Sequence, residues 1–454
     1  MKIAKFGGSS VATWEQIEKV FQIVVSDSER KIIVVSAPGK RFPDDIKITD
    51  LLIVCGQKAI RGEDYSDAFH QVIKRYSEIA NGLGLSSSLI DEISLNIELT
   101  LTRDHANQTR FMDAVMACGE DNCARLVANY FQLKEINAHY INPGEAGLYV
   151  TNEPGQAQVL PKSYPLIYEL RKKSGILVFP GFFGYSEEGD IVTFSRSGSD
   201  ITGSVVANGV KANLYENFTD VDAVYSVNPT IIQNPKEIKE LTYREMRELS
   251  YAGFNVFHDE ALIPAFEAGI PVNIKNTNNP SAPGTRIVKE RKLLNGPLIG
   301  IASDNGFCSI YISKYLMNRE IGFGRKLLQI LEDFKISYEH QPSGIDDISV
   351  IIRQNQLSNE LEVQIIERIK NELNPDHVVI ERNLALIMLV GEGMRHNVGT
   401  TARASKALAD ASINIEMINQ GSSEVSMMFG VKASDEKKAV KVIYEEFFSK
   451  VSSK

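Results

Sequence analysis

The stretch that decides the fold is Lys5-Phe6-Gly7-Gly8-Ser9-Ser10, which follows an apolar start and precedes a helical pattern. Residues 14–25 carry apolar side chains at helical spacing, so the sequence predicts a strand, a glycine turn and a helix in succession. Glycines let backbone N–H groups approach an anion closely, and a lysine on the strand adds a point charge. The hexapeptide predicts a phosphate site, with plain turn chemistry as the alternative.

The composition is that of an ordinary globular protein, long enough for two or three domains. The chain has 454 residues, of which 43% are hydrophobic and 24% charged, and its formal net charge is −9. This acidic balance argues against nucleic acid or an anionic membrane as partner, because phosphate groups attract clustered Lys and Arg. Four scattered cysteines without a Cys-x-x-Cys pair predict reduced thiols and no protein metal site. With no signal peptide and no apolar run of about eighteen residues, we expect a cytoplasmic protein.

Strand and helix patterns alternate through the first 290 residues. Apolar runs predict strands at 32–35, 138–141, 176–179, 213–216 and 271–275. Such alternation is typical of an α/β fold with a mostly parallel sheet and helices on both faces. Thr49 and Asp50 are expected to cap a helix, and Glu120 to precede one. A helix is expected at 259–268, a loop at 276–284 and a linker at 290–297.

Beyond the linker a shorter module appears twice. Residues 303–382 predict strands at 308–313, 336–340, 348–353 and 377–381, with helices at 321–333 and 360–372. This order, βαββαβ, is that of a ferredoxin-like unit. Residues 383–454 begin the same order again but end before the last strand, which would leave an open sheet edge. We expect the spare strand at 297–302 to complete this second module.

Polar residues gather where the predicted strands of the first sheet end. They are Lys5, Gly7, Gly8, Ser9, Ser36, Arg196, Ser199, Asp200, Thr219 and Asp220, with Glu120 ahead of a helix. A strand lysine, a glycine cradle and nearby acidic residues indicate phosphoryl transfer, which depends on positioning and charge neutralisation. Each residue also has a simpler interpretation. Arg196 could form a surface salt bridge, and Asp200 could be a helix N-cap. Glu120 could be a solvated carboxylate in the first turn of a helix, and Thr219-Asp220 could form a plain turn. Their joint placement at one sheet edge is what those interpretations leave unexplained.

Three of these segments resemble the amino-acid kinase family and, within it, the aspartate kinases. They are Lys5–Ser10, Thr193-Phe-Ser-Arg-Ser-Gly-Ser-Asp200 and Glu216-Asn-Phe-Thr-Asp-Val221. Gly391-Glu-Gly-Met-Arg-His396 and residues 414–423 resemble the ACT repeats of monofunctional, lysine-regulated aspartokinases. The resemblance covers essentially the whole chain. It implies a three-layer αβα kinase domain at 1–290 and two ferredoxin-like ACT domains at 303–382 and 383–454.

The resemblance also implies an activity and a set of site residues. The activity is ATP-dependent phosphorylation of the L-aspartate side chain to 4-phospho-L-aspartate, the first step towards lysine, threonine and methionine, with Mg²⁺ carried by the nucleotide. Lys5 and Asp200 would be catalytic, and no general base is needed because the carboxylate is itself the nucleophile. Substrate would contact Ser36, Thr49, Glu120, Arg196 and Ser199. ATP would contact Lys5, Gly7, Gly8, Ser9, Thr219, Asp220 and Tyr225.

Two departures from the family pattern concern the nucleotide. Asn228-Pro229-Thr230 stands where the family often has Asp-Pro-Arg, and Asn255 stands where it often has Lys. Both changes remove a cation that would face phosphate, and Lys275 is our candidate replacement.

The ACT repeats imply an amino-acid effector, lysine or threonine or both, bound between paired modules of a homodimer or higher homo-oligomer. The matching residues are Met317, Gly322, Phe323, Gly324, Asp346 and Asp347. Alternatively, Asp346 and Asp347 simply cap the strand at 348–353.

Three other functions are weighed against this interpretation. A kinase of another small carboxylate, such as N-acetylglutamate, is disfavoured by the C-terminal repeats and by Glu120, the expected partner of a free α-amino group. A catalytically silent amino-acid sensor is disfavoured by intact Lys5, Arg196 and Asp200. A nicotinamide dehydrogenase is weaker still, because no Gly-x-Gly-x-x-Gly follows a strand.

Overall fold

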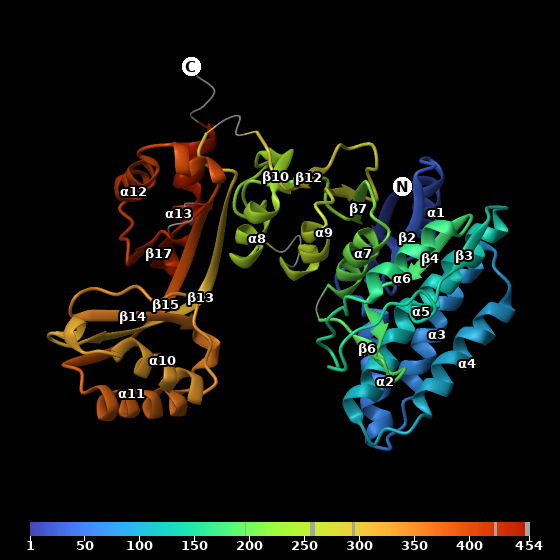
Figure 1. Cartoon of the computed structure of the whole chain (residues 1–454), viewed down its shortest axis with the longest axis horizontal. Helices are drawn as coiled ribbons and strands as arrows, with labels where there is room; N and C mark the ends of the chain where they lie inside the picture. Colours follow the sequence, from blue (N-terminus) through green and yellow to red (C-terminus); the bar gives the residue numbers. More distant parts are fainter. Residues whose placement is uncertain (196, 255–258, 293–295, 422–424, 450–454) are drawn as a thin grey trace. The chain divides into compact units, whose positions relative to one another are not determined.

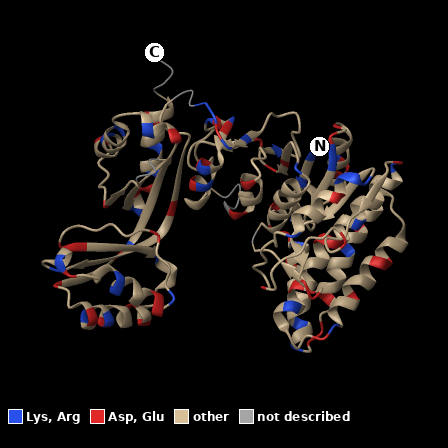
Figure 2. Ribbon diagram, viewed as in Figure 1, with Lys and Arg blue, Asp and Glu red and all other residues tan. Residues whose placement is uncertain are grey.

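The computed structural model describes residues 1–195, 197–254, 259–292, 296–421 and 425–449 (Figure 1). The chain forms two compact units, each with its own sheet. The first contains residues 1–224, 237–246 and 256–291, and the second contains 225–236, 247–255 and 292–454. Acidic and basic residues are interspersed along the helices of both units (Figure 2). No helix in the described part of the chain has the length and apolar character needed to cross a membrane.

The first unit is built on an eight-stranded sheet in the order β10-β12-β11-β7-β1-β2-β4-β3. Its strands are β1 (Lys2–Phe6), β2 (Arg30–Val35), β3 (Ala138–Tyr140), β4 (Ile176–Pro180), β7 (Leu214–Thr219), β10 (Glu240–Thr242), β11 (Val272–Asn276) and β12 (Thr285–Val288). Every neighbouring pair is parallel except β11 and β12. The predicted α/β class with a mostly parallel sheet is therefore confirmed.

Helices cover both faces of this sheet (Figure 1). They are α1 (Trp14–Val25), α2 (Ile48–Ile60), α3 (Ser66–Leu83), α4 (Ser87–Leu101), α5 (Gln108–Leu133), α6 (Ser163–Tyr168), α7 (Gly198–Gly209) and α9 (Ile263–Glu267). Helix α1 packs with Ala4 and Phe6 in one core, while α7 approaches the opposite face, where Lys5 meets Asp200. A hairpin of β5 (Phe183–Tyr185) and β6 (Ile191–Thr193) precedes α7.

Several local expectations in this unit are wrong. Helix α2 begins at Ile48 with Lys47 as its N-cap, so Thr49 and Asp50 lie within its first turn. Glu120 lies in the middle of α5 because the helix continues through Gly119, which packs closely against Ala37 after β2. The expected helix at 259–268 is present, as a 3₁₀ turn, Asp259–Leu262, that continues directly into α9 and ends at Glu267. Strands β10 and β12 were not expected.

The second unit contains a five-stranded antiparallel sheet in the order β14-β13-β15-β17-β16. Its strands are β13 (Gly300–Ser313), β14 (Asp347–Arg353), β15 (His377–Val390), β16 (Met417–Asn419) and β17 (Ser426–Lys432). Its helices are α10 (Phe323–Asp333), α11 (Asn359–Leu373), α12 (Thr400–Asp410) and α13 (Glu436–Tyr444). Helix α8 (Tyr243–Tyr251) ends in this unit.

Two strands run through both halves of this sheet. The segments expected as separate strands at 297–302 and 308–313 form one strand, β13, and those at 377–381 and 384–391 form β15. The register of β13 shifts around Gly306, whose φ of +81° suits a bulge. Ile301 therefore faces the core of α12 and α13, whereas Ile310 faces the core of α10 and α11. The expected strand at 336–340 is only a single bridge, between His340 and Ile351.

Candidate active site

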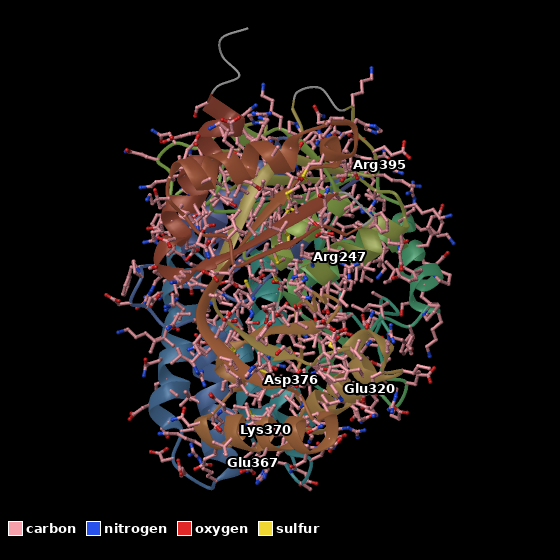
Figure 3. The ribbon with its side chains drawn as sticks, turned by 90° about the vertical axis from the view of Figure 1, so that its left-hand side faces the viewer. Arg247, Glu320, Glu367, Lys370, Asp376 and Arg395 are labelled. Atoms are coloured by element: carbon pink, nitrogen blue, oxygen red, sulfur yellow. The ribbon has the colours of Figure 1, made fainter. Side chains whose placement is uncertain are left out.

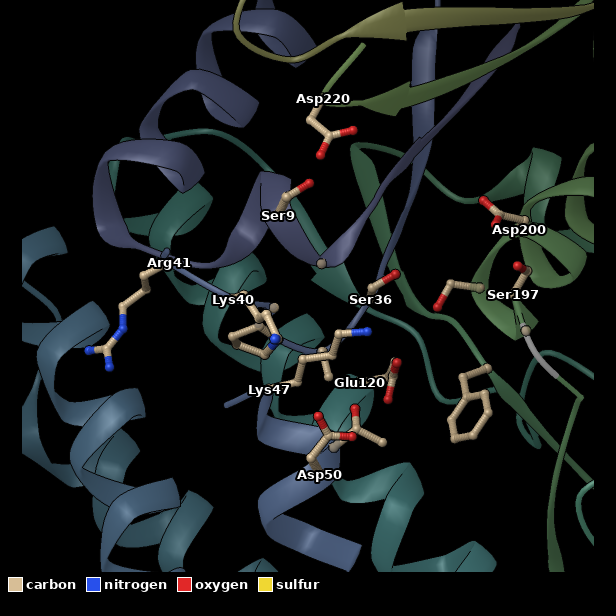
Figure 4. Close-up of a pocket in the computed structure, with 18 of the residues that line it drawn as sticks. Ser9, Ser36, Lys40, Arg41, Lys47, Asp50, Glu120, Ser197, Asp200 and Asp220 are labelled. Atoms are coloured by element: carbon tan, nitrogen blue, oxygen red, sulfur yellow. The ribbon is translucent and has the colours of Figure 1, made fainter. Parts of the chain in front are cut away.

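A pocket of about 680 Å³ lies at the carboxyl ends of β1 and β2 (Figure 4). Its lining includes nine residues that the sequence singled out: Lys5, Gly8, Ser9, Ser36, Thr49, Glu120, Ser199, Asp200 and Asp220. These residues come from β1 and the 3₁₀ turn after it, the ends of β2 and β7, and helices α2, α5 and α7. The fold thus brings together side chains that are far apart in the sequence.

Lys5 supplies a buried positive charge in this pocket. Its ammonium lies 2.6 Å from Oδ1 of Asp200, and its side chain is only 8% exposed. The Nδ2 of Asn217 donates to the same carboxylate oxygen at 2.6 Å. Asp200 lies in the first turn of α7, after the N-cap Ser197, so the N-cap interpretation of Asp200 is wrong. The Asp200 carboxylate instead fixes the Lys5 ammonium in place.

The glycine turn after β1 packs directly on the loop after β2. The N–H of Gly39 donates to the carbonyl of Gly8 at 2.9 Å. A Cβ on Gly39 would lie 2.6 Å from the carbonyl carbon of Gly8, and a Cβ on Gly8 would lie 3.2 Å from Cα of Gly39. Only glycine allows two backbones to approach this closely.

Glu120 projects from α5 into the pocket as a buried carboxyl group. It is 6% exposed, and its Oε2 has no hydrogen-bond partner among the described residues. Burial raises the pKa of Glu120 to about 8, although a backbone hydrogen bond from Ala37 and the charge of Lys5 oppose the rise. The interpretation of Glu120 as a solvated first-turn carboxylate is therefore wrong. When ionised, this buried oxygen needs a hydrogen-bond donor, which a bound ligand or a water molecule can supply.

The cations of the loop between β2 and α2 were not predicted from the sequence. Lys40, Arg41 and Lys47 line the pocket, and Figure 4 shows the Lys47 side chain directed into it. The available signal was their position after the carboxyl end of β2, the edge where ligands bind in open α/β sheets.

Other predicted residues lie outside the pocket lining. Gly7 donates its N–H to the carbonyl of Phe218 at 3.1 Å, and Thr219 donates its hydroxyl to Asp220 at 3.1 Å. Lys275 pairs in register with Phe218, which stacks on Phe6, so it lies on the sheet face opposite to Lys5. Burial lowers the pKa of Lys275. Tyr225 belongs to the second unit, while Arg196 and Asn255 fall outside the described residues.

In the second unit, the segment that contains Met317 and the segment that contains Asp346 and Asp347, both expected to bind an effector, lie against each other. The N–H of Leu316 donates to Asp346 Oδ1 at 2.8 Å, and the N–H of Asn318 donates to the carbonyl of Ile345 at 3.1 Å. Two side chains also hold the segment that contains Met317. Glu320 accepts from Lys314, and Asp376 accepts from the N–H of Tyr315 at 2.7 Å (Figure 3).

Five of the six predicted effector residues fall into three groups, and the sixth, Asp346, accepts from the N–H of Leu316. Met317 and Phe323 are buried in the core under α10 and α11, so only their backbones can reach a ligand. Gly322 and Gly324 stand at the start of α10. Asp347 lines a separate pocket of about 500 Å³, which also contains the carboxylates of Glu381 and Glu416.

A sheet edge with a lysine, a glycine turn and convergent acidic side chains defines a phosphoryl-transfer enzyme of the amino acid kinase type. The sequence profile of the amino acid kinase family matches residues 1–276, and that of the ACT domain matches residues 387–447. The chain belongs to the amino acid kinase family. It is 62% identical to aspartokinase 3 of Bacillus subtilis (strain 168) over 451 residues, which cover 99% of each chain.

Solved structures agree with this grouping. The crystal structure of Clostridium acetobutylicum aspartate kinase matches with a TM-score of 0.89 and 41% identity, covering 98% of this chain and 100% of that one. Aspartokinase III of E. coli, solved with lysine and aspartate, matches with a TM-score of 0.77 at 22% identity and covers 99% of both chains, which shows the shared fold. Within its family the chain is an aspartate kinase, and it uses ATP.

Proposed function

We propose that the pocket at the ends of β1 and β2 is where this enzyme transfers the γ-phosphoryl group of ATP to the side-chain carboxylate of L-aspartate. The reaction opens the aspartate pathway towards lysine, threonine and methionine, and ACT domains regulate it. The observation that carries the assignment to this pocket is the unpartnered Oε2 of Glu120. A free α-ammonium group supplies the missing donor, whereas an N-acetylated substrate carries no such charge.

Lys5 and the glycine turn indicate which end of the pocket binds phosphate. Lys5 and the backbone of Gly8 and Ser9 face the transferring phosphoryl group and neutralise the charge that spreads over its oxygens, while Gly7, whose N–H is bonded to Phe218, shapes the turn. Mg²⁺ would arrive with the nucleotide and share that task. Asp220 offers carboxylate oxygens of the kind that this ion prefers.

The cations of the β2–α2 loop extend this end of the pocket. Lys40 follows Gly39, which packs on Gly8, so Lys40 lies beside the glycine turn. The family often carries two phosphate-facing cations that this chain lacks at Thr230 and Asn255. We assign their role to Lys40 and Lys47 rather than to Lys275. Thr219 and Tyr225 are retained as nucleotide contacts on the strength of the resemblance.

The amino-acid end is formed by Glu120 and the hydroxyls around it. Glu120 receives the α-ammonium group, Thr49 in the first turn of α2 lines the same pocket, and Ser36 and Ser199 flank the reacting carboxylate. Arg196 would hold the α-carboxylate through its guanidinium fork. The substrate carboxylate then attacks phosphorus directly, with Asp200 holding Lys5 in place.

Regulation is assigned to the second unit, whose acidic pocket suits a cationic amino acid. Asp347, Glu381 and Glu416 bring three carboxylates to its lining, and no Lys or Arg is among the described residues that line it. We propose lysine as the effector, with threonine as a second candidate, and ACT domains at 303–382 and 383–454. We further propose that the enzyme is cytoplasmic and that copies associate through these domains.

The experiment that tests the assignment is an ADP-release assay with ATP and Mg²⁺. Aspartate, glutamate and N-acetylglutamate are offered in turn, each with and without lysine and threonine. We expect turnover on aspartate alone, suppressed by lysine. Turnover on N-acetylglutamate would contradict the role of Glu120, and lysine binding without any turnover would support a silent sensor.

A further inference from the structure

Residues 38–47, the larger part of the 36–47 loop that joins β2 to α2, contain no regular helix or strand and form one wall of the pocket. It supplies three cations to the pocket lining, Lys40, Arg41 and Lys47. Loops of this kind are mobile unless side chains hold them. What holds this loop therefore decides where its lysines stand.

One buried guanidinium group, that of Arg75 on α3, holds both ends of the 38–47 loop. Its Nη1 donates to the carbonyl of Gly39 at 3.0 Å, near the start of the loop. Its Nη2 donates to both carboxylate oxygens of Asp45, at 2.9 and 2.8 Å, and to the carbonyl of Ile46 at 3.2 Å. Arg75 is 4% exposed although it is charged, so this set of partners offsets its desolvation.

A second guanidinium group joins the same carboxylate from within the loop. Arg41 donates to Asp45 from Nε at 2.9 Å and from Nη2 at 3.0 Å, and its Nη1 reaches Glu78 of α3 at 2.9 Å. The Arg41 guanidinium holds the pKa of Asp45 well below its ordinary value, so this carboxylate stays charged.

The loop in turn is locked to the glycine turn of β1. Gly39, whose carbonyl Arg75 holds, donates its N–H to the carbonyl of Gly8 at 2.9 Å. A Cβ on Gly39 would clash with Gly8, so the two backbones are in close contact with no space between them. A shift of Gly39 therefore moves Gly8 and the turn that follows.

We propose that Arg75 is a positioning residue for phosphoryl transfer, which sets Lys40, Lys47 and the glycine turn in register by holding Gly39 and Asp45. Arg75 is not part of the lining of this pocket and acts only through these groups. The proposal rests on the assignment of the pocket as the active site. It explains why a buried arginine stands outside the pocket with its donors directed at the loop that forms the pocket wall.

The test compares Arg75→Met with Arg30→Met. Arg30 is a matched control because it is also buried and donates two hydrogen bonds to one carboxylate, that of Glu216, at 2.6 and 3.0 Å. Like Arg75, it is not part of the pocket lining. In Arg75→Met we expect kcat/KM to fall about 100-fold, mainly through kcat, as a misplacement of about 1 Å can cause. Backbone hydrogen exchange should rise in residues 38–47 and 8–10. Arg30→Met should stay within about threefold of wild type, because the hydrogen bonds of Arg30 go to Glu216, Ile23 and Ser26 and none of them reaches the 38–47 loop.

The conservative variant Arg75→Lys keeps a charge for Asp45 but cannot fork to Gly39 and Ile46 at once. We expect it to fold and to lose about tenfold in kcat/KM. Unchanged kcat/KM in folded Arg75→Met, or an equal loss in Arg30→Met, would overturn the proposal. If Arg75→Met does not fold, unchanged kinetics and exchange in Arg75→Lys overturn it. Lys5→Met tests the pocket assignment separately, because full activity in that variant would refute the pocket while leaving the exchange result for Arg75 intact.

Discussion

Replacing Glu120 with glutamine should flatten the pH profile of kcat/KM for aspartate. The pKa of this buried carboxyl group is raised to about 8, and kcat/KM reports ionisations of the free enzyme. If the substrate ammonium binds only to the ionised carboxylate, kcat/KM rises about tenfold per pH unit below pH ~7 and levels above pH ~9. A glutamine side chain has no such ionisation, so Glu120→Gln should lose this slope.

The size of the loss at high pH follows from the bond that is removed. A hydrogen bond to a charged group contributes about 1.5–3 kcal/mol, which corresponds to a loss of about 10- to 150-fold in kcat/KM at pH ~8.5. The assay is ADP release at limiting aspartate between pH ~6 and ~9. Asp50→Asn is the matched control, because Asp50 is an exposed carboxylate of the same pocket. A pH slope that persists in Glu120→Gln, or that disappears in Asp50→Asn, would refute the reasoning.

The same ionisation affects the unliganded fold. The pKa of Glu120 is raised from 4.5 in its ordinary state to about 8 in the folded protein, so the folded state holds a proton that the unfolded chain has lost. Stability therefore falls as pH rises from about 4.5 to about 8. Thermal unfolding across this range should show a weaker decline in Glu120→Gln, and aspartate should counter the decline in the wild type.

Three further variants test other parts of the structure. Lys5→Met removes the buried phosphate-facing charge and should lower kcat about 100- to 1,000-fold in the ADP-release assay with little change in circular dichroism; near-normal kcat would contradict its role. Gly39→Ala forces a Cβ to within 2.6 Å of Gly8, so urea unfolding should report a loss of about 1–3 kcal/mol together with reduced kcat/KM; unchanged values for both would mean that the contact relaxes freely. Asp346→Ala combined with Asp347→Ala should raise the lysine concentration needed for half-inhibition and leave uninhibited kcat unchanged, and unaltered inhibition would move the effector elsewhere.

The start of the chain could be predicted from local pattern alone. The helix at 14–25 and the glycine turn were predicted with the boundaries that α1 and its preceding turn show, because both depend on neighbouring residues. The long strand β13 was not, since Asp304-Asn305-Gly306 interrupts its apolar pattern as a break between two strands would. Pairing with β15 carries the strand through this bulge, and that pairing is a tertiary effect.

The types of residue in the site could be predicted from the sequence. The burial of their side chains and the sheet face on which they lie were harder to predict. Glu120 was singled out from its place ahead of a predicted helix and was given its role by resemblance, but its burial depends on how α5 packs against Ala37, which no local pattern records. Lys275 was a reasonable candidate from its strand end, yet its side of the sheet is set by the register between β11 and β7. The role of Arg75 depends on contacts with residues about thirty positions away, so its spacing gave no signal.

The two long strands of the second unit limit which fragments of this enzyme can fold on their own. Since β13 and β15 each cross both hydrophobic cores, a fragment that begins at residue 383 would keep half of β15 and lose the strand residues 300–305 that pair with it. Its newly bared edge would offer a row of unpaired backbone groups to any neighbouring strand. Fragments made for calorimetry or crystallisation should therefore keep residues 292–454 in one piece, together with residues 225–236, whose Val227 belongs to the core of α12 and α13. The two halves should melt together in one transition rather than as separable modules.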